Sequence, residues 1–458
     1  MSGASGVQPR SMARQLASLS WPLIGLNVLN VLALAVDTAM CGRLDGADQV
    51  LIALGFSTQL IFLLMVAMIG LTVGTVATIA RAHGAGDRAR VDHTLAQSSQ
   101  LTVILGLSIG VIGQFVAGPF VSAMGGSDEV RAIAVTYLRP LLAGTALPYL
   151  SILYAAALRG VGNTRLAFVV ALVINGLNAF FNYGLILGHW GMPALGLRGA
   201  AYGTVLAYFF GVILMMSLLL QGQVPALGLR VRLVAIDRPM AKELLRIGWP
   251  AAFDMVVLNA AFLSIVGMLG RIDELAVAAH GIGLRVQALA FVPGMSVSQA
   301  TGALVGQALG AGNIERARQV LRASVRLSMA IMTTLGALII AAGAQIVTVF
   351  DVDPLSSLGQ FSLDWMKLLG YGMPIVGFYV AYVGLLQGAG ATRVSLRINL
   401  MTTFGFQIPL SYFLGFPMGL GAWGVWAAFP LAFLFKAALA HRAYKTDMWA
   451  ALGSRGRR

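Results

Sequence analysis

The chain has 458 residues, of which 58% are hydrophobic and only 10% are charged. Soluble domains carry about 25% charged residues, so this composition excludes an ordinary soluble enzyme and indicates a membrane protein with many spans. The net charge is +14, but no basic groove with interleaved aromatic residues accompanies it, which argues against nucleic-acid binding. The one cysteine, Cys41, excludes an intramolecular disulfide framework and a cysteine-based metal site.

Twelve apolar segments follow one another along the chain, each long enough to cross a hydrocarbon core of roughly 30 Å as a helix. They predict an all-α polytopic membrane protein with twelve transmembrane helices. The first segment is too long for the core of a signal peptide, so we expect it to be retained. The expected spans are residues 19–40, 51–79, 94–117, 131–157, 165–188, 199–221, 245–269, 276–305, 321–349, 363–386, 395–415 and 419–441.

Most of the 31 lysine and arginine residues fall in segments that share a side with both termini. Cytoplasmic loops carry such an excess of positive charge, and an even number of spans returns the chain to its starting side. We therefore expect a multi-pass protein of a bacterial-type inner (plasma) membrane with both termini in the cytoplasm. The net charge then reflects this topology and an attraction to anionic lipid headgroups.

The second half of the chain repeats motifs of the first half in the same order. Each half holds six expected spans, so both halves start on the same side, and the repeats are parallel around an axis along the membrane normal. Two such bundles can rock against each other and expose a central cleft to either side in turn. The motifs recur 228 residues apart: WP at 21 and 249, GR at 42 and 270, RAR at 88 and 316, and GxGxTR at 160 and 388.

This repeat divides the chain into two lobes and three connecting or terminal segments. The N-lobe and the C-lobe are the two six-helix bundles, and the cytoplasmic linker joins them. The expected boundaries are a cytoplasmic N-terminal tail at 1–18, the N-lobe at 19–221, the linker at 222–242, the C-lobe at 243–441 and a basic cytoplasmic tail at 442–458.

Asp37 is the one carboxylate in the apolar run Trp21–Leu44, in the second half of the first expected span. Acids inside a membrane are costly and usually face a cavity, a partner or an ion. Asn178 and Asn182 lie one turn apart on one face of the fifth expected span, which suits either an ion site or hydrogen bonds between helices. Thr204, on the sixth span, could join them or bond a carbonyl one turn back.

A second group of polar residues lies on the seventh and eighth expected spans. Asp254 and Arg285 both approach the middle of the membrane on consecutive antiparallel helices, so a buried pair between them is one possible arrangement. Such a pair could be a structural salt bridge or a contact to substrate in the cleft. Gln287 could line the same polar face or take part in helix packing.

Taken together, the repeated motifs resemble the multidrug and toxic compound extrusion (MATE) family over nearly the whole chain. They are the WP or xP start of the first helix, the loops AHGAGDRAR and GQALGAGNIERAR, and the turns LRGVGNTR and LQGAGATR. The segment VDTAMCGRLD resembles the first helix of the DinF-like branch of this family. In that branch the acid that matches Asp37 is an ion-coupling residue, and the resemblance implies the same role here.

The resemblance also implies roles for Asn178, Asn182 and Thr204, which match polar positions that accompany this acid. Asn182 occupies a place where well-known members carry a second aspartate. The family's carboxylate on the seventh helix would fall near Leu258, and the nearest acid, Asp254, lies about one turn earlier. Both departures leave the choice between protons and sodium, and the stoichiometry, open.

The sequence lacks the motifs of ATP hydrolysis, zinc proteolysis and serine hydrolysis, so we expect a transporter rather than an enzyme. No cofactor is expected beyond a coupling ion, H⁺ or Na⁺. We expect an antiporter that exports small cationic or amphipathic organic compounds by alternating access, acting as a monomer among membrane lipids. The alternatives are a channel, which twofold pseudo-symmetry disfavours, and a lipid-linked precursor flippase of the same wider superfamily.

Overall fold

A computed structural model describes residues 12–44, 46–228 and 235–454 of the chain. Every regular element in these residues is a helix. The N-lobe holds α1 (Met12–Cys41), α2 (Ala47–Gly84), α3 (Arg88–Ala123), α4 (Asp128–Ala143), α5 (Ala146–Gly160), α6 (Thr164–Leu187) and α7 (Leu197–Leu220). The C-lobe holds α8 (Arg238–Gly270), α9 (Glu274–Gly310), α10 (Ile314–Ala341), α11 (Gly343–Val349), α12 (Ser357–Gly388), α13 (Thr392–Thr402), η1 (Thr403–Gln407), α14 (Ile408–Gly415), α15 (Gly421–Lys445) and α16 (Met448–Ser454).

These helices confirm the expected all-α, multi-span architecture. Ten helices among the described residues are long and apolar enough to cross a membrane, and α4 with α5 forms an eleventh span bent by 53°. The bend follows Pro140 and Gly144, which weaken the helix at that point. The remaining expected span, 395–415, is the helical run α13–η1–α14, in which the π-helical segment η1 changes the phase of the helix.

The domain boundaries expected from the sequence fall close to helix ends but do not coincide with them. Helix α1 begins at Met12 and α8 begins at Arg238, because these helices continue past the apolar segments that define the spans. The described part of the chain omits residues 1–11 of the expected tail, 229–234 of the expected linker and 455–458 of the basic tail. Those parts of the expected boundaries lie outside the described residues.

The helix caps correct the register of one of the repeated turns. Asp87 and Asn313 are the N-cap residues of α3 and α10, and each follows a glycine with positive φ. These caps are 226 residues apart, whereas the RAR motifs are 228 apart. A glycine with positive φ followed by an Asp or Asn N-cap sets the conformation of this turn. The spacing of the RAR motifs therefore differs from the spacing of the turns themselves.

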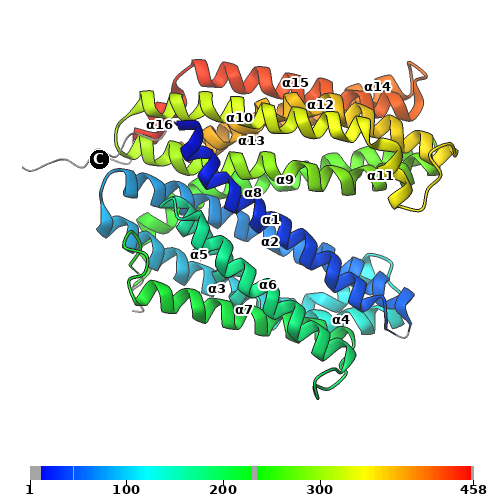
Figure 1. Cartoon of the computed structure of the whole chain (residues 1–458), viewed down its shortest axis with the longest axis horizontal. Helices are drawn as coiled ribbons and strands as arrows, with labels where there is room; N and C mark the ends of the chain where they lie inside the picture. Colours follow the sequence, from blue (N-terminus) through cyan, green and yellow to red (C-terminus); the bar gives the residue numbers. More distant parts are fainter. Residues whose placement is uncertain (1–11, 45, 229–234, 455–458) are drawn as a thin grey trace, which may run out of the picture.

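The first and last described residues, Met12 of α1 and Ser454 of α16, lie at the same end of the molecule, called the terminal end below; the opposite end is the distal end (Figure 1). The two lobes lie close together at the terminal end and diverge toward the distal end (Figure 1). Glycines permit this close approach, because a Cβ on Gly84 of α2 would overlap the carbonyl oxygen of Gln307 on α9. Gly70 of α2 and Gly248 of α8 form a second such contact.

Polar contacts between the lobes reinforce the closure at the terminal end. The guanidinium of Arg90 on α3 lies 3.0 Å from the carboxylate of Glu243 on α8. The side-chain amide of Gln307 donates to the carbonyl of Gly160 at 2.9 Å, and Asn27, at the middle of α1, donates to Ser296 at 3.0 Å. Apart from Asn27, these groups lie in the terminal halves of their helices. These contacts join the two lobes at the terminal end, whereas the helices of the two lobes diverge toward the distal end (Figure 1).

Candidate functional site

The structure brings together the four residues predicted to form the ion-coupling site. The amide of Asn182 donates to the Asp37 carboxylate at 2.7 Å, and also to the side-chain oxygen of Asn178 at 3.3 Å. The amide of Asn178 in turn donates to the hydroxyl of Thr204 at 3.1 Å. The chain Asp37–Asn182–Asn178–Thr204, called the N-lobe cluster below, thus links α1, α6 and α7.

Local sequence explains why these groups meet. Asn178 and Asn182 are one helical turn apart and lie on the same face of α6. On α7, a Cβ on Gly203 would overlap the side-chain oxygen of Asn182. The absence of a side chain at Gly203 therefore lets α7 pack directly over the amide and brings Thr204 within reach.

The residues of the N-lobe cluster differ in solvent exposure. Asn182 is 0% exposed and Asn178 is 7% exposed, whereas Asp37 and Thr204 are half-buried. The buried amides hold a fixed geometry, whereas the Asp37 side chain stays partly exposed in the distal part of α1. Such an arrangement suits a group that exchanges an ion as the cleft opens and closes.

One acceptor in this cluster has no hydrogen-bond donor. The side-chain oxygen of Asn182 is buried without a partner among the described residues. An unsatisfied buried acceptor costs about 1–3 kcal/mol, so it is a position where a donor or a cation would be stabilised. The N-lobe cluster thus contains carboxylate, amide and hydroxyl oxygens, which are the groups that bind a proton or a cation in proteins. Among the described residues, no group of three or more His, Cys, Asp or Glu could hold a metal ion.

The second predicted group does not form: Asp254 and Arg285 do not pair. The Asp254 carboxylate accepts hydrogen bonds from Asn399 at 2.8 Å and from Ser395 at 3.2 Å, both on α13. Arg285 is exposed on α9, and its guanidinium lies over the ring of Phe350, 5.9 Å from the ring centroid. Gln287 is half-buried and makes no side-chain hydrogen bond among the described residues.

Asp254 and Arg285 do not meet because depth in the membrane does not fix the direction in which a helix presents a side chain. Asp254 and Arg285 reach similar expected depths, but α8 turns Asp254 toward α13 and α9 turns Arg285 toward the segment after α11. The neighbour that a side chain meets depends on how its helix is rotated against the helices packed around it. The sequence did not contain that information for these two helices.

Around Asp254 the structure instead forms a polar group that sequence reasoning missed, called the C-lobe cluster below. Asn399, which donates to Asp254, accepts a hydrogen bond from the hydroxyl of Tyr379 at 2.9 Å. The ammonium group of Lys436 on α15 is buried, with the residue 2% exposed, and interacts electrostatically with Asp254. Lys436 lies inside the last expected span, 419–441. An intramembrane lysine is itself a signal for a buried partner, and that signal could have identified it.

The comparisons with known proteins agree with the two-lobe repeat. The MatE family model matches residues 22–184 and 250–413, once in each lobe. The chain is similar to a probable multidrug resistance protein NorM of Thermotoga maritima, at 28% identity over 95% of this chain and 93% of that protein. A multidrug resistance protein NorM of Burkholderia vietnamiensis is 31% identical over 91% of each chain.

A solved structure shares the fold. It is described as the outward-facing conformation of a multidrug resistance MATE family transporter, with a TM-score of 0.88, 23% identity and 99% coverage of both chains. Members of this family are transporters and not enzymes, which agrees with the repeated six-helix lobes around a cleft. The chain therefore belongs to the multidrug and toxic compound extrusion (MATE) family of membrane transporters.

Proposed function

We propose that this MATE family protein is a secondary active efflux transporter that exchanges protons for small cationic or amphipathic organic compounds. The observation that carries the proposal is the N-lobe cluster, in which a half-buried carboxylate is held by an amide inside the membrane. A group of this kind can take up an ion from one side and release it to the other as the cleft changes access. Nothing in the cluster requires a cofactor.

Alternating access gives the carboxylate its role. With the cleft open at the distal end, Asp37 is accessible and can take up a proton, which neutralises the acid before the lobes rock. When the terminal end opens, the proton leaves, and an outgoing cation can enter while Asp37 is charged. Exchange follows if the protonated and the substrate-bound forms both permit rocking and the empty charged form does not.

Protons are favoured over sodium by the composition of the N-lobe cluster. It holds one carboxylate, Asp37, and two neutral amides, so it offers less negative charge than a site with two acids. A sodium ion depends on several charged or strongly polar oxygens to replace its hydration shell, whereas a proton needs one carboxylate. Rotation of the Asn182 side-chain amide would turn its unpaired oxygen toward Asp37, where it would accept a hydrogen bond from the protonated carboxyl group.

The proposed orientation puts the terminal end in the cytoplasm of a plasma membrane, as the excess of basic residues at that end requires. A test uses a Cys41→Ser background with one new cysteine, either Gln223→Cys near the terminal end or Glu129→Cys at the distal end; both positions are exposed. A membrane-impermeant maleimide added to intact cells should label position 129 and leave position 223 unlabelled. The reverse pattern would invert the topology.

The transport proposal is tested with purified protein in proteoliposomes that contain a fluorescent lipophilic cation. A proton gradient and a sodium gradient are imposed separately, each with the other ion balanced. We expect export driven by the proton gradient alone. Export that requires sodium and persists without a proton gradient would contradict proton coupling, and cation leak without any imposed gradient would indicate a channel. Movement of a labelled lipid-linked precursor, but not of the cation, would favour the flippase alternative.

A further inference from the structure

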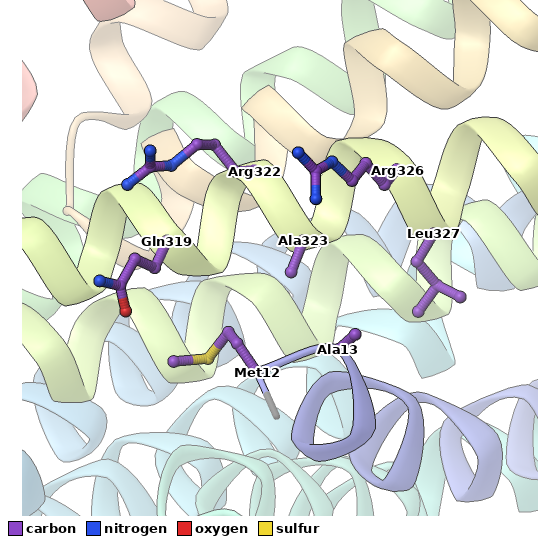
Figure 2. A pocket seen from close by; sticks show the side chains of 7 residues that line it. All are labelled: Met12, Ala13, Gln319, Arg322, Ala323, Arg326 and Leu327. Carbon is purple, nitrogen blue, oxygen red and sulfur yellow. The ribbon is translucent and has the colours of Figure 1, made fainter. Parts of the chain in front are cut away.

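A cavity at the terminal end lies between the two lobes and outside both polar clusters. It measures about 650 Å³ and opens between the start of α1, in the N-lobe, and α10, in the C-lobe. Its walls come from Met12 and Ala13 of α1 and from Gln319, Arg322, Arg326 and Leu327 of α10 (Figure 2). Neither the coupling chemistry nor the cleft uses these residues.

The cavity is basic on its α10 side. Arg322 and Arg326 are one helical turn apart, both are exposed, and both guanidinium groups lie on the same side of α10 (Figure 2). Arg322 pairs with Glu315. Arg326 makes no side-chain hydrogen bond or ion pair among the described residues. The cavity therefore presents one guanidinium without a counter-charge, supported by a second guanidinium and the amide of Gln319.

The position of these arginines fits a membrane interface. They lie at the start of the expected span 321–349, on the face of α10 opposite to buried Leu321, Ser324 and Ser328. Arginines at this depth extend their guanidinium groups toward the headgroup layer. Met12 and Leu327 make the remaining wall apolar, as the upper part of a lipid acyl chain requires.

The chemistry of the cavity selects an anionic phosphodiester. A guanidinium binds phosphate oxygens with two parallel hydrogen bonds, and basic pockets between helices at the cytoplasmic surface bind lipid headgroups. The chain's own first residues do not complement the cavity, because residues 1–11 contain Arg10 and no carboxylate. A membrane lipid is the anion that is always present at this depth.

We propose that this cavity binds the phosphodiester headgroup of an anionic phospholipid in the leaflet at the terminal end, and that the lipid stabilises the conformation with an open distal cleft. Because α1 and α10 belong to different lobes, rocking changes the distance between the walls of the cavity. A ligand that binds one arrangement better shifts the population toward it. The identification of this leaflet as cytoplasmic depends on the proposed topology; binding itself does not.

The test compares lipid retention by the full-length protein and two charge-matched variants. Arg322→Gln/Arg326→Gln removes both guanidiniums of the cavity. Arg397→Gln/Arg442→Gln removes two exposed arginines of the same lobe that do not line the cavity. Native mass spectrometry after titration with phosphatidylglycerol should show about tenfold weaker retention for the cavity variant and less than about twofold change for the control. Phosphatidylcholine should bind neither variant nor the parent specifically.

Two further measurements distinguish a bound lipid from a soluble phosphate and from nonspecific charge attraction. Glycerol 3-phosphate at millimolar concentration should not displace phosphatidylglycerol, and displacement would mean that the cavity binds a soluble phosphate. Arg322→Lys/Arg326→Lys keeps the charge without the planar fork and should restore only part of the retention. Equal loss of retention in the cavity variant and the control would overturn the proposal, since general charge would then account for the binding.

The conformational part is measured with spin labels at Glu129→Cys and Glu274→Cys in the Cys41→Ser background, at the distal ends of the two lobes. Vesicles that contain phosphatidylglycerol should increase the population with the longer distance, relative to phosphatidylcholine vesicles. The cavity variant should lose this lipid response. An unchanged response in the cavity variant would show that the lipid acts elsewhere. Because these experiments measure binding and distance, they remain informative even if the protein proves not to exchange protons.

Discussion

The two lobes share a fold but hold their intramembrane carboxylates in different ways. Asp37 in the N-lobe is half-buried, accepts a hydrogen bond from one amide and forms no ion pair among the described residues. Asp254 in the C-lobe is 7% exposed, accepts hydrogen bonds from an amide and a hydroxyl, and interacts electrostatically with buried Lys436 without a salt bridge among the described residues. The first environment leaves an acid free to exchange an ion, whereas the second compensates the charge of the acid in place.

The repeat itself shows that this difference is not inherited from the shared scaffold. Asp254 follows Pro250 by four residues, and the residue at the same place after Pro22 is Leu26. Conversely, the position that matches Asp37 in the C-lobe is Ile265, which is buried. Each lobe thus places apolar side chains where the other lobe has its acid, so one scaffold supports two chemistries.

The helix that carries the partners of each acid also differs between the lobes. In the N-lobe, α6 continues without a break through Asn178 and Asn182. In the C-lobe, the corresponding helical run is interrupted by the π-helical segment η1, which includes Phe406, 228 residues after Asn178. A π-helical segment shifts the phase of the residues that follow it. Asn399, the amide of the C-lobe cluster, lies before this segment, so the phase shift does not change its direction.

The largest expected effect separates the two acids by function. Asp37→Asn keeps shape and hydrogen bonding but removes titration, so gradient-driven efflux should be abolished. Substrate binding to purified protein should survive within roughly tenfold, or about 1.4 kcal/mol. The measurement is export from proteoliposomes at matched protein content, together with equilibrium binding of the transported cation. Efflux at the parental rate would mean that Asp37 is structural.

The second prediction concerns the charge balance of the C-lobe cluster. Asp254→Asn removes a negative charge that interacts with buried Lys436, so it should lower the stability of the folded protein by about 1–3 kcal/mol. Lys436→Met should have a similar effect, and the double variant should recover most of the loss. The measurement is thermal and denaturant unfolding in detergent. As a control, the stability losses of Asp254→Asn and Arg285→Gln should add in the double variant, because these side chains are apart. A non-additive loss would mean that Asp254 and Arg285 interact after all.

The third prediction compares matched amides. Asn182→Ala removes the hydrogen bond to Asp37, and a bond to a charged group contributes about 1.5–3 kcal/mol, so proton-driven efflux should fall by about tenfold or more. Asn399→Ala removes the equivalent donor from Asp254 and should lower stability while efflux per folded molecule stays within about twofold. Both variants are compared at equal amounts of folded protein by size-exclusion chromatography. Equal transport defects would place both acids in the coupling mechanism.

The smallest effect is expected at the contact that closes the terminal end. Arg90 and Glu243 come from different lobes and are partly exposed, so their pair contributes about 0.5 kcal/mol to closure. Arg81 of α2 is a second, more distant partner of Glu243 at 3.9 Å, and Glu243→Gln removes both contacts. Glu243→Gln should shift the population modestly toward an open terminal end, measured as faster labelling of a cysteine in the terminal half of the cleft. Asp364→Asn removes an exposed ion pair within α12 alone and serves as the control. An equal rise in both variants would assign the effect to surface charge.

Much of the architecture could be predicted because it depends on properties that are local in sequence. Apolar segments of membrane-spanning length predicted the helices, and the recurrence of WP and GxGxTR predicted two lobes. The N-lobe cluster was also accessible, since Asp37 is an isolated intramembrane acid and Asn178 and Asn182 share a helical face at a spacing of four residues.

Only the tertiary structure decided which distant groups meet. The partners of Asp254 depend on the rotation of α8 relative to α13 and α15, so Asp254 meets Asn399 and Lys436 and not Arg285. The end at which the two lobes join likewise depends on backbone contacts such as Gly84 against Gln307, which link segments far apart in the chain. Composition and period determine how each helix lies in a membrane, whereas the angular packing between helices arises from the summed contacts of all of them.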